Sequence, residues 1–170
     1  SIIKDQKLQK NEFVLATIHR QENTDDEKKL RSIFLGLEEI HKTHTVILPM
    51  HPRTKAVLNK LSIHPKIQVI EPVGYYDMLE LLKNCSIVIT DSGGLQKEAF
   101  FNRKQTIVVR DETEWVELVS HGFAKVVGGN TKMILQTFDT FKATNKEFTV
   151  DLYGNNVGEK IYQSIYQLIH

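Results

Sequence analysis

The chain has 170 residues, of which 41% are hydrophobic and 25% charged, the size and balance of one globular domain. Its net charge of +1 carries no electrostatic signature of nucleic acid or an anionic membrane, so neither is an expected partner. A single cysteine (Cys85), no membrane-length apolar run and no signal-peptide core at the N-terminus together predict a cytoplasmic protein.

Taken in chain order, residues 1–10 show no strand pattern and are expected to be a linker from something upstream. After them, short β-branched runs alternate with longer amphipathic stretches. The runs predict strands at Phe13–Ile18, Thr45–Leu48, Ile67–Ile70, Ser86–Thr90, Thr106–Val109 and Ala124–Val127. Their nearly continuous apolar character is typical of strands covered on both faces, as in a parallel sheet.

Helical spacing of apolar residues fills the intervals between these strands. Helices are predicted at Asp25–Thr43, Arg53–Leu61, Tyr76–Lys83, Leu95–Phe101, Glu114–Ser120 and Thr131–Phe141. This alternation predicts an α/β fold with a doubly wound parallel sheet, Rossmann-like, with right-handed crossovers. A final helix, Gly158–Ile169, either packs on the sheet or crosses to a missing partner domain; the sequence leaves both open.

In sheets of this kind, ligands bind beyond the carboxyl ends of the strands. Polar and charged residues gather there in the segments 19–23, 49–53, 71–75, 91–94 and 110–114. The turns at the opposite edge, at 43–44, 64–65, 84–85 and 103–104, are interpreted as plain surface turns. The carboxyl edge is therefore the predicted site.

The turn after the fourth predicted strand is the most informative. Ser92, Gly93 and Gly94 open the following helix, where free amides and the helix dipole favour a phosphate. Glu98 lies one turn further on, where its carboxylate could accept hydrogen bonds from ribose hydroxyls. A simple helix cap would explain the same turn. The absence of a Walker lysine and of G-x-G-x-x-G disfavours generic nucleotide motifs.

Three cationic or titratable side chains leave neighbouring strands at that edge: His19, Arg20 and His51. Histidine transfers protons and arginine grips phosphate, so their coincidence favours a site over chance surface polarity. No group has metal-ligand spacing, and neither a metal nor a cofactor is predicted. His41 and His44 are interpreted as structural residues at a helix C-terminus, and Cys85 lies at the wrong edge for a nucleophile.

The motifs HRQEN, PMHPR, EPVGYYDMLELL, DSGGLQKEA and RDETEW, in this order, resemble the C-terminal half of the non-hydrolysing UDP-N-acetylglucosamine 2-epimerases. That family has the two-lobed glycosyltransferase-B fold, with the active site between two Rossmann-like lobes. The resemblance covers nearly the whole chain but only the second lobe. It implies that 1–10 are a linker from a missing N-terminal lobe and that 11–145 are the UDP-binding lobe. Residues 146–170 are then a loop and the C-terminal helix, for which a crossing to the missing lobe stays one of the two alternatives.

The resemblance also implies roles for individual residues. Ser92, Gly93 and Gly94 match the diphosphate turn, and Glu98 matches the ribose-binding glutamate. His19 matches the histidine that faces the diphosphate. The segment from Val73 to Met78 frames the uracil, while Arg20 and His51 resemble contacts to an allosteric second UDP-sugar. The matched residues are His19, Arg20, His51, Val73, Met78, Ser92, Gly93, Gly94 and Glu98.

The implied reaction converts UDP-GlcNAc to UDP-ManNAc, a polysaccharide precursor, by elimination and re-addition of UDP. Its carboxylate acid and base groups belong to the missing lobe, so we expect the isolated chain to be inactive. The resemblance further implies a homodimer for the full-length protein.

Two departures and two alternatives accompany this interpretation. Trp115 and Val116 stand where the family usually has arginine and proline, which leaves a modified substrate, such as a UDP-diacetamido uronic acid, open. Val73 and Met78 shift the uracil contacts towards backbone. A glycosyltransferase donor lobe is the other enzyme alternative. A phosphoacceptor receiver domain fits poorly, because its acidic pair, aspartate and lysine are replaced by 19–20, Glu71 and Arg110.

Overall fold

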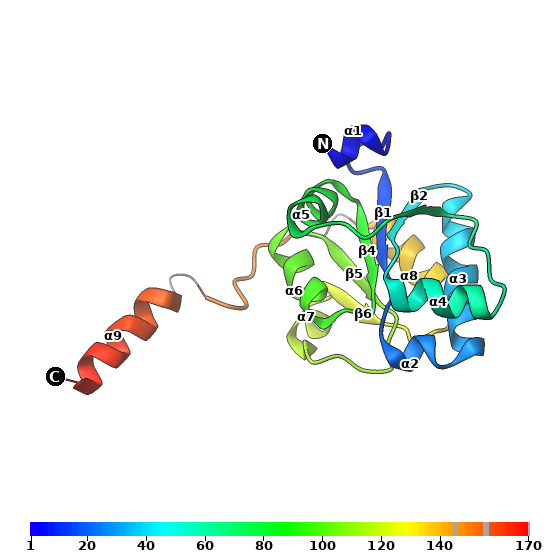
Figure 1. Cartoon of the computed structure of the whole chain (residues 1–170). Coiled ribbons are helices and arrows are strands. Elements are labelled where there is room, and N and C mark those ends of the chain that lie inside the picture. The colour runs from blue at the N-terminus through cyan, green and yellow to red at the C-terminus, as the bar shows by residue number, and fades with distance from the viewer. Residues whose placement is uncertain (145, 155–156, 170) are drawn as a thin grey trace.

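The computed structural model describes residues 1–144, 146–154 and 157–169. Six strands form one sheet: β1 (Phe13–Thr17), β2 (Thr45–Pro49), β3 (Gln68–Ile70), β4 (Ile87–Thr90), β5 (Gln105–Val108) and β6 (Ala124–Val126). Each lies within one residue of its predicted bounds. Every pairing is parallel, and the order is β3-β2-β1-β4-β5-β6 (Figure 1). The predicted doubly wound α/β sheet is confirmed, with its strand order reversing between β1 and β4.

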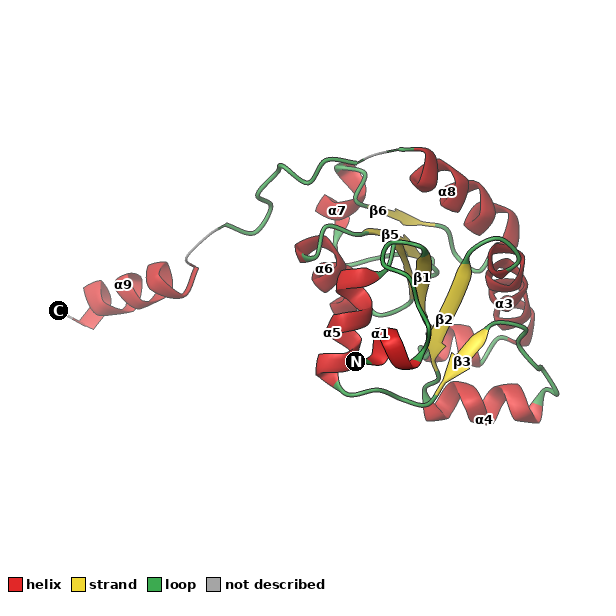
Figure 2. Cartoon of the chain, turned by 90° about the horizontal axis from the view of Figure 1, so that it is seen from above, coloured by secondary structure: helices red, strands yellow, loops and turns green. Residues whose placement is uncertain are grey.

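Helices cover both faces of this sheet (Figure 2). One side carries α3 (Glu27–His41), α4 (Pro52–Lys60) and α8 (Thr131–Ala143); the other carries α1 (Ile2–Asp5), α5 (Tyr75–Asn84), α6 (Gly93–Phe101) and α7 (Val116–Ser120). A one-turn helix, α2 (Gln21–Thr24), follows β1. The sequence had predicted neither α1 nor α2, because a single turn is too short to show helical periodicity.

The strands alternate their side chains between two cores. Val14 and Ala16 of β1 point to the core under α3 and α8, whereas Phe13 and Leu15 point to the core under α5 and α6. All five residues of β1 are buried. Burial on both faces explains why the sequences of these strands are unbroken apolar runs. A third hydrophobic cluster, around Phe100 and Phe123, lies where α6 and α7 pack against β5 and β6.

The two ends of the chain differ from the central domain. At the start, Ile2 of α1 is buried in the core that holds Leu81 and Leu82, so residues 1–10 include a packed helix as well as connecting chain. At the end, α9 (Val157–Ile169) stands apart from the sheet (Figures 1 and 2). It exposes Ile161, Tyr162, Ile165 and Tyr166. No helix in the described part of the chain is long and apolar enough to span a membrane.

Candidate functional site

A cavity of about 340 Å³ opens at the carboxyl ends of β1, β2 and β4, where the strand order reverses. This switch point is where open α/β sheets bind their ligands. Its lining comprises Thr17, Ile18, His19, Pro49, His51, Pro72, Val73, Met78, Ser92, Gly94, Leu95 and Glu98. Seven of the residues predicted from the sequence therefore meet in one cavity: His19, His51, Val73, Met78, Ser92, Gly94 and Glu98.

The N-terminus of α6 forms one wall of this cavity. Ser92 is the N-cap, and its Oγ accepts a hydrogen bond of 3.3 Å from the amide of Leu95. The amide of Gln96 donates to the Ser92 carbonyl at 3.4 Å, which begins the helix. The amides of Gly93 and Gly94 have no acceptor among the described residues. They leave two donors, and the positive end of the helix dipole, available to an anion.

The two glycines of this turn have different surroundings. A β-carbon added to Gly94 would meet nothing within 4 Å, because the position faces the open cavity. A β-carbon added to Gly93 would lie 3.2 Å from Oε2 of Glu114 and 3.6 Å from Nη2 of Arg20. Gly93 is therefore needed for packing, whereas Gly94 leaves room for a ligand to approach the backbone.

Glu98 lines the cavity one turn along α6. Among the described residues, its carboxylate has neither an ion pair nor a hydrogen bond, although its backbone carbonyl accepts from Asn102. Most other carboxylates near this edge are already paired with cations. Glu98 is thus a half-buried acceptor with both oxygens available to hydroxyl groups of a ligand.

His19 is held by the buried carboxylate of Asp91, which follows β4. The amide of His19 donates to Oδ2 of Asp91 at 2.9 Å, and Nδ1 of its ring lies 3.3 Å from Oδ1. The amide of Arg20 and Nδ2 of Asn23 also donate to Oδ2, at 2.9 and 3.0 Å. Asp91 is fully buried. These bonds fix both the loop after β1 and the direction of the imidazole.

A second histidine lies beside the first. The rings of His19 and His51 have centroids 5.3 Å apart and are tilted by 31°. His51 caps α4, and its Nδ1 accepts from the amide of Arg53 at 3.2 Å. That bond leaves Nε2 as the nitrogen that can carry the ring proton. Two neighbouring imidazoles thus line the cavity, together with the hydrophobic side chains of Val73 and Met78.

Behind the glycine turn lies a network of arginines and glutamates. The buried Arg110 donates from Nε to Glu22 at 2.8 Å and from Nη1 to both oxygens of Glu114. Burial alone would lower the pKa of Arg110, but the hydrogen bonds and charges of the two glutamates raise it. The hydrogen bond from Arg110 lowers the pKa of Glu114. Arg20 joins through Nη2, 3.7 Å from Glu114.

Trp115 supports the same turn from outside the cavity. Its indole Nε1 donates to the carbonyl of Gly93 at 2.7 Å. Thr113, two residues earlier, donates to Oε1 of the buried Gln96 at 2.6 Å, so the segment 110–115 is bonded to α6 at two points. Of the predicted site residues, Trp115, Arg20 and Gly93 do not line the cavity. They lie behind it and contact its wall.

Sequence reasoning gave several residues of this site no individual role, although the segments expected at this edge include Asn23, Pro49, Pro72 and Asp91. Asp91 and Asn23 orient His19, and the lining is completed by Thr17, Ile18, Pro49, Pro72 and Leu95. Asp91 carried a signal, because an acidic residue directly after a buried strand is positioned at the ligand edge. The described residues contain no group of three or more His, Cys, Asp or Glu that could hold a metal ion.

The family model for UDP-N-acetylglucosamine 2-epimerase matches residues 1–166. The chain belongs to this family. Among curated members, it is 47% identical over 143 residues to the UDP-2,3-diacetamido-2,3-dideoxy-D-glucuronate 2-epimerase of Pseudomonas aeruginosa, covering 84% of this chain and 40% of that protein. It is 35% identical over 159 residues to the UDP-N-acetylglucosamine 2-epimerase of Methanocaldococcus jannaschii, covering 89% of this chain and 43% of that protein.

A solved structure of an epimerase of this family, that of M. jannaschii in complex with UDP-GlcNAc and UDP, superposes with a TM-score of 0.84 at 32% identity. The match covers 98% of this chain and 48% of that chain. A glycosyltransferase at 13% identity and a TM-score of 0.58 shares the fold alone. The predicted fold class, one lobe of the glycosyltransferase-B type, is confirmed. The chain spans less than half the length of the epimerases that it matches.

Proposed function

We propose that this chain supplies the UDP-binding half of a UDP-sugar 2-epimerase. The observation that carries the proposal is the cavity at the switch point, where unpaired amides of a helix N-terminus, an imidazole and an unpaired carboxylate converge. A nucleoside diphosphate offers the complementary groups: two phosphates for the amides and imidazole, and ribose hydroxyls for the carboxylate.

The residues predicted from the sequence then have the following roles. The amides of Gly93 and Gly94 and the hydroxyl of Ser92 bind the diphosphate, and Glu98 accepts from the ribose hydroxyls. Val73 and Met78 frame the uracil. His19, oriented by Asp91, faces the diphosphate as a proton donor or a cation. Arg20 and His51 border the side on which a sugar, or a second UDP-sugar, would lie.

The proposed reaction eliminates UDP from the sugar and adds it back after the proton at carbon 2 has changed face. The bond from carbon 1 to the diphosphate oxygen breaks, and negative charge develops on the leaving diphosphate. Preoriented amides stabilise such charge without reorganisation; removing one such donor typically costs about 3–4 kcal/mol. We place the carboxylates that move the carbon-2 proton on a second lobe, so the 170-residue chain alone should bind UDP without turnover.

The test is calorimetric titration of the chain with UDP. Glu98→Ala should weaken binding by about tenfold, the loss typical of hydrogen bonds to a charged group. Gly94→Val should abolish binding without loss of stability, since the added side chain enters open space. Glu112→Ala and Gly158→Val are matched controls outside the cavity and should bind UDP normally. Unchanged UDP affinity in both Glu98→Ala and Gly94→Val would refute the site.

A second candidate substrate is a UDP-diacetamido uronic acid. Two observations favour it over UDP-GlcNAc: Trp115 replaces the arginine usual in the family, and the relative named for the diacetamido glucuronate substrate is 47% identical, against 35% for the M. jannaschii enzyme. Turnover of the two sugars by the chain joined to its second lobe, compared by kcat/KM, decides between them.

The remaining assignments concern the whole protein. We propose that residues 1–10 connect to an N-terminal lobe, that 11–145 form the UDP-binding lobe, and that the segment 146–170 crosses to the other lobe. The exposed apolar face of α9 supports this crossing, because Ile161 and Ile165 need a partner surface. We also propose a cytoplasmic homodimer. Sedimentation of the complete protein tests the dimer.

A further inference from the structure

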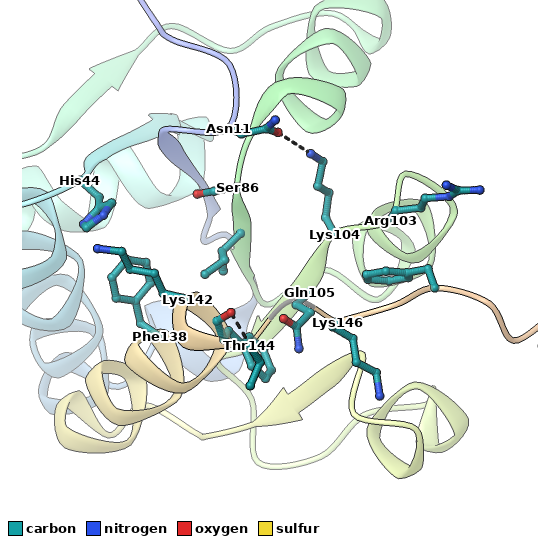
Figure 3. Close-up of a pocket in the computed structure, with 13 residues that line it drawn as sticks. Asn11, His44, Ser86, Arg103, Lys104, Gln105, Phe138, Lys142, Thr144 and Lys146 are labelled. Carbon is teal, nitrogen blue, oxygen red and sulfur yellow. Dashed lines mark hydrogen bonds between the residues drawn. The ribbon is translucent and has the colours of Figure 1, made fainter.

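A second cavity, of about 360 Å³, lies at the opposite edge of the sheet (Figure 3). It opens where β1, β2, β4 and β5 begin, between the C-terminal end of α8 and the turn after α6. In Figure 3, His44 and Lys142 stand on one side, and Asn11 and Lys104 on the other. Because the strands are parallel, this edge is the one farthest from the proposed UDP site. The two cavities have no lining residue in common.

The charged side chains around this second cavity are all cationic. Arg103, Lys104, Lys142 and Lys146 line it, together with His44, and no aspartate or glutamate does so. None of these four cations forms an ion pair with a described carboxylate. The contrast with the carboxyl edge is sharp, since Arg110, Arg20 and Lys29 are each paired there. Lys104 also donates to Oδ1 of Asn11 at 3.1 Å, and Nζ of Lys146 lies 5.0 Å from the centre of the Phe123 ring. Without carboxylate partners, these cations make the lining of the second cavity positive.

Helix dipoles account for only part of this charge. The helices α3, α5, α6 and α8 all end at this edge, and lysines near helix C-termini are ordinary compensation. Each helix end is equivalent to about −0.5 charge, so four ends supply about −2 against four full positive charges. Two carboxylates lie nearby but outside the lining: Asp139 acts on His44, and Glu147 lines an adjoining hollow with Arg103 and Lys146. Within the lining itself, the charged side chains are all positive.

Burial, more than the neighbouring charges, disfavours the charged forms of two bases at this cavity. Burial lowers the pKa of Lys104, and the charge of Lys10 lowers it further, against an opposing effect of Cys85. Burial and then the charge of Lys142 lower the pKa of His44, against the opposing charge of Asp139. An anion in the cavity would reverse these effects, because it favours the charged form of each base.

Apart from Asn11, the rest of the lining is apolar or has its donors already engaged. Ile87, Phe138 and Phe141 are buried side chains that form the floor, and the ring of His44 packs edge-on against Phe138 at 5.2 Å. Ser86 donates to the Phe13 carbonyl, and Gln105 donates to that of Gly122. A ligand would thus find apolar contacts inside and cations around the rim.

We propose that this cavity binds a small organic anion, a phosphate or carboxylate carried on an apolar or aromatic body, with Lys104 and Lys142 as its principal ligands. The anionic group meets the lysines, and the body covers Ile87 and Phe138. This site is separate from the proposed UDP cavity and does not depend on it.

Phenyl phosphate is the probe for a titration of the ¹⁵N-labelled chain followed by NMR. We expect saturable chemical-shift changes at the amides of Ser86 and Gln105. The amide of Gly94, in the other cavity, should show no such change. In the double variant Lys104→Gln/Lys142→Gln, the dissociation constant should rise at least about tenfold, because charge-assisted hydrogen bonds are lost. The control Lys28→Gln/Lys60→Gln, which removes two exposed lysines elsewhere, should bind as the parent chain does.

Benzoate distinguishes a carboxylate from a phosphate, and binding of either supports the site. Phenol and inorganic phosphate each lack one half of the ligand and should bind more weakly. Added salt should weaken the binding of phenyl phosphate. Unchanged affinity in Lys104→Gln/Lys142→Gln, or phenol binding as tightly as phenyl phosphate, would overturn the proposal. UDP shifts at Gly94 report the other cavity, so the two proposals fail independently.

Discussion

The carboxylate of Asp91 lies 3.3 Å from Nδ1 of His19 and accepts the backbone amide of the same residue at 2.9 Å. Asp91 follows β4 and His19 follows β1, so this contact joins the ends of the two strands on either side of the switch point. A buried carboxylate with several donors holds its partners in one geometry. The imidazole that faces the cavity is therefore positioned by a residue that does not itself line it.

Asp91→Asn tests this arrangement. The asparagine amide would place an N–H₂ donor among the amides of His19 and Arg20, leaving buried donors unpaired. We expect the free energy of unfolding to fall by about 1–3 kcal/mol and UDP affinity to fall with it. Urea unfolding and calorimetry measure the two effects. Glu112→Gln, an exposed change of the same chemistry, should alter neither. Wild-type stability in Asp91→Asn would contradict the positioning role.

The pairing of Arg110 with Glu114 predicts a pH dependence. Because Arg110 lowers the pKa of Glu114 in the folded state, the pair contributes stability that is present above the ordinary glutamate pKa of about 4.3. That contribution is lost as the pH falls through the lowered pKa. Arg110→Gln should lower the free energy of unfolding by about 1–3 kcal/mol near neutral pH. This is less than the loss of a fully buried ion pair, because both glutamates are partly exposed.

Urea unfolding across this acidic range measures the effect. The difference in stability between the parent chain and Arg110→Gln should narrow as the pH falls below about 4.3. Arg53→Gln, which removes an exposed arginine without an ion pair among the described residues, should show no such narrowing. If the stability difference between the parent chain and Arg110→Gln does not change with pH, lost packing rather than lost charge explains the destabilisation.

Cys85 should be unreactive in the folded chain. The thiol is fully buried and donates to the carbonyl of Leu82 at 3.3 Å, and burial raises its pKa to about 12. Alkylation by iodoacetamide should therefore follow the population of unfolded chain, accelerating across the urea transition. Fast alkylation under native conditions would show that the segment between α5 and β4 opens locally. The prediction that Cys85 is no nucleophile agrees with this burial.

The sheet could be predicted from the sequence because buried parallel strands have continuous apolar sequences. The helices of this chain show a different, amphipathic pattern. The sequence was also sufficient for the cavity, because strand-end residues such as His19, Ser92 and Glu98 must meet at one edge once the strands are parallel. Topology alone brings them together. No knowledge of side-chain contacts was required for this part.

Contacts between distant segments were beyond sequence reasoning. Nothing in the local pattern shows that Trp115 donates to the carbonyl of Gly93, 22 residues away, or that Asp91 bonds to the loop after β1. The turns 43–44 and 103–104 were interpreted as plain surface, yet His44, Arg103 and Lys104 line one cavity. The clustering of those cations depends on how α8 packs across the strand starts. The sequence of α8 does not indicate which strands this helix packs against.

Trp115→Phe separates support of the glycine turn from simple packing. Phenylalanine keeps an aromatic ring beside Lys97, whose Nζ lies 4.7 Å from the Trp115 ring, but it cannot donate to the Gly93 carbonyl. Loss of one hydrogen bond costs about 1 kcal/mol, so UDP should bind roughly fivefold more weakly if the bond holds the amides of Gly93 and Gly94 in place. Calorimetry measures the affinity, since the variant lacks the tryptophan needed for fluorescence. Tyr162→Phe, which alters an exposed ring on α9 outside the cavity, is the control. If Trp115→Phe lowers thermal stability yet binds UDP as the parent chain does, Trp115 packs against the turn without positioning it.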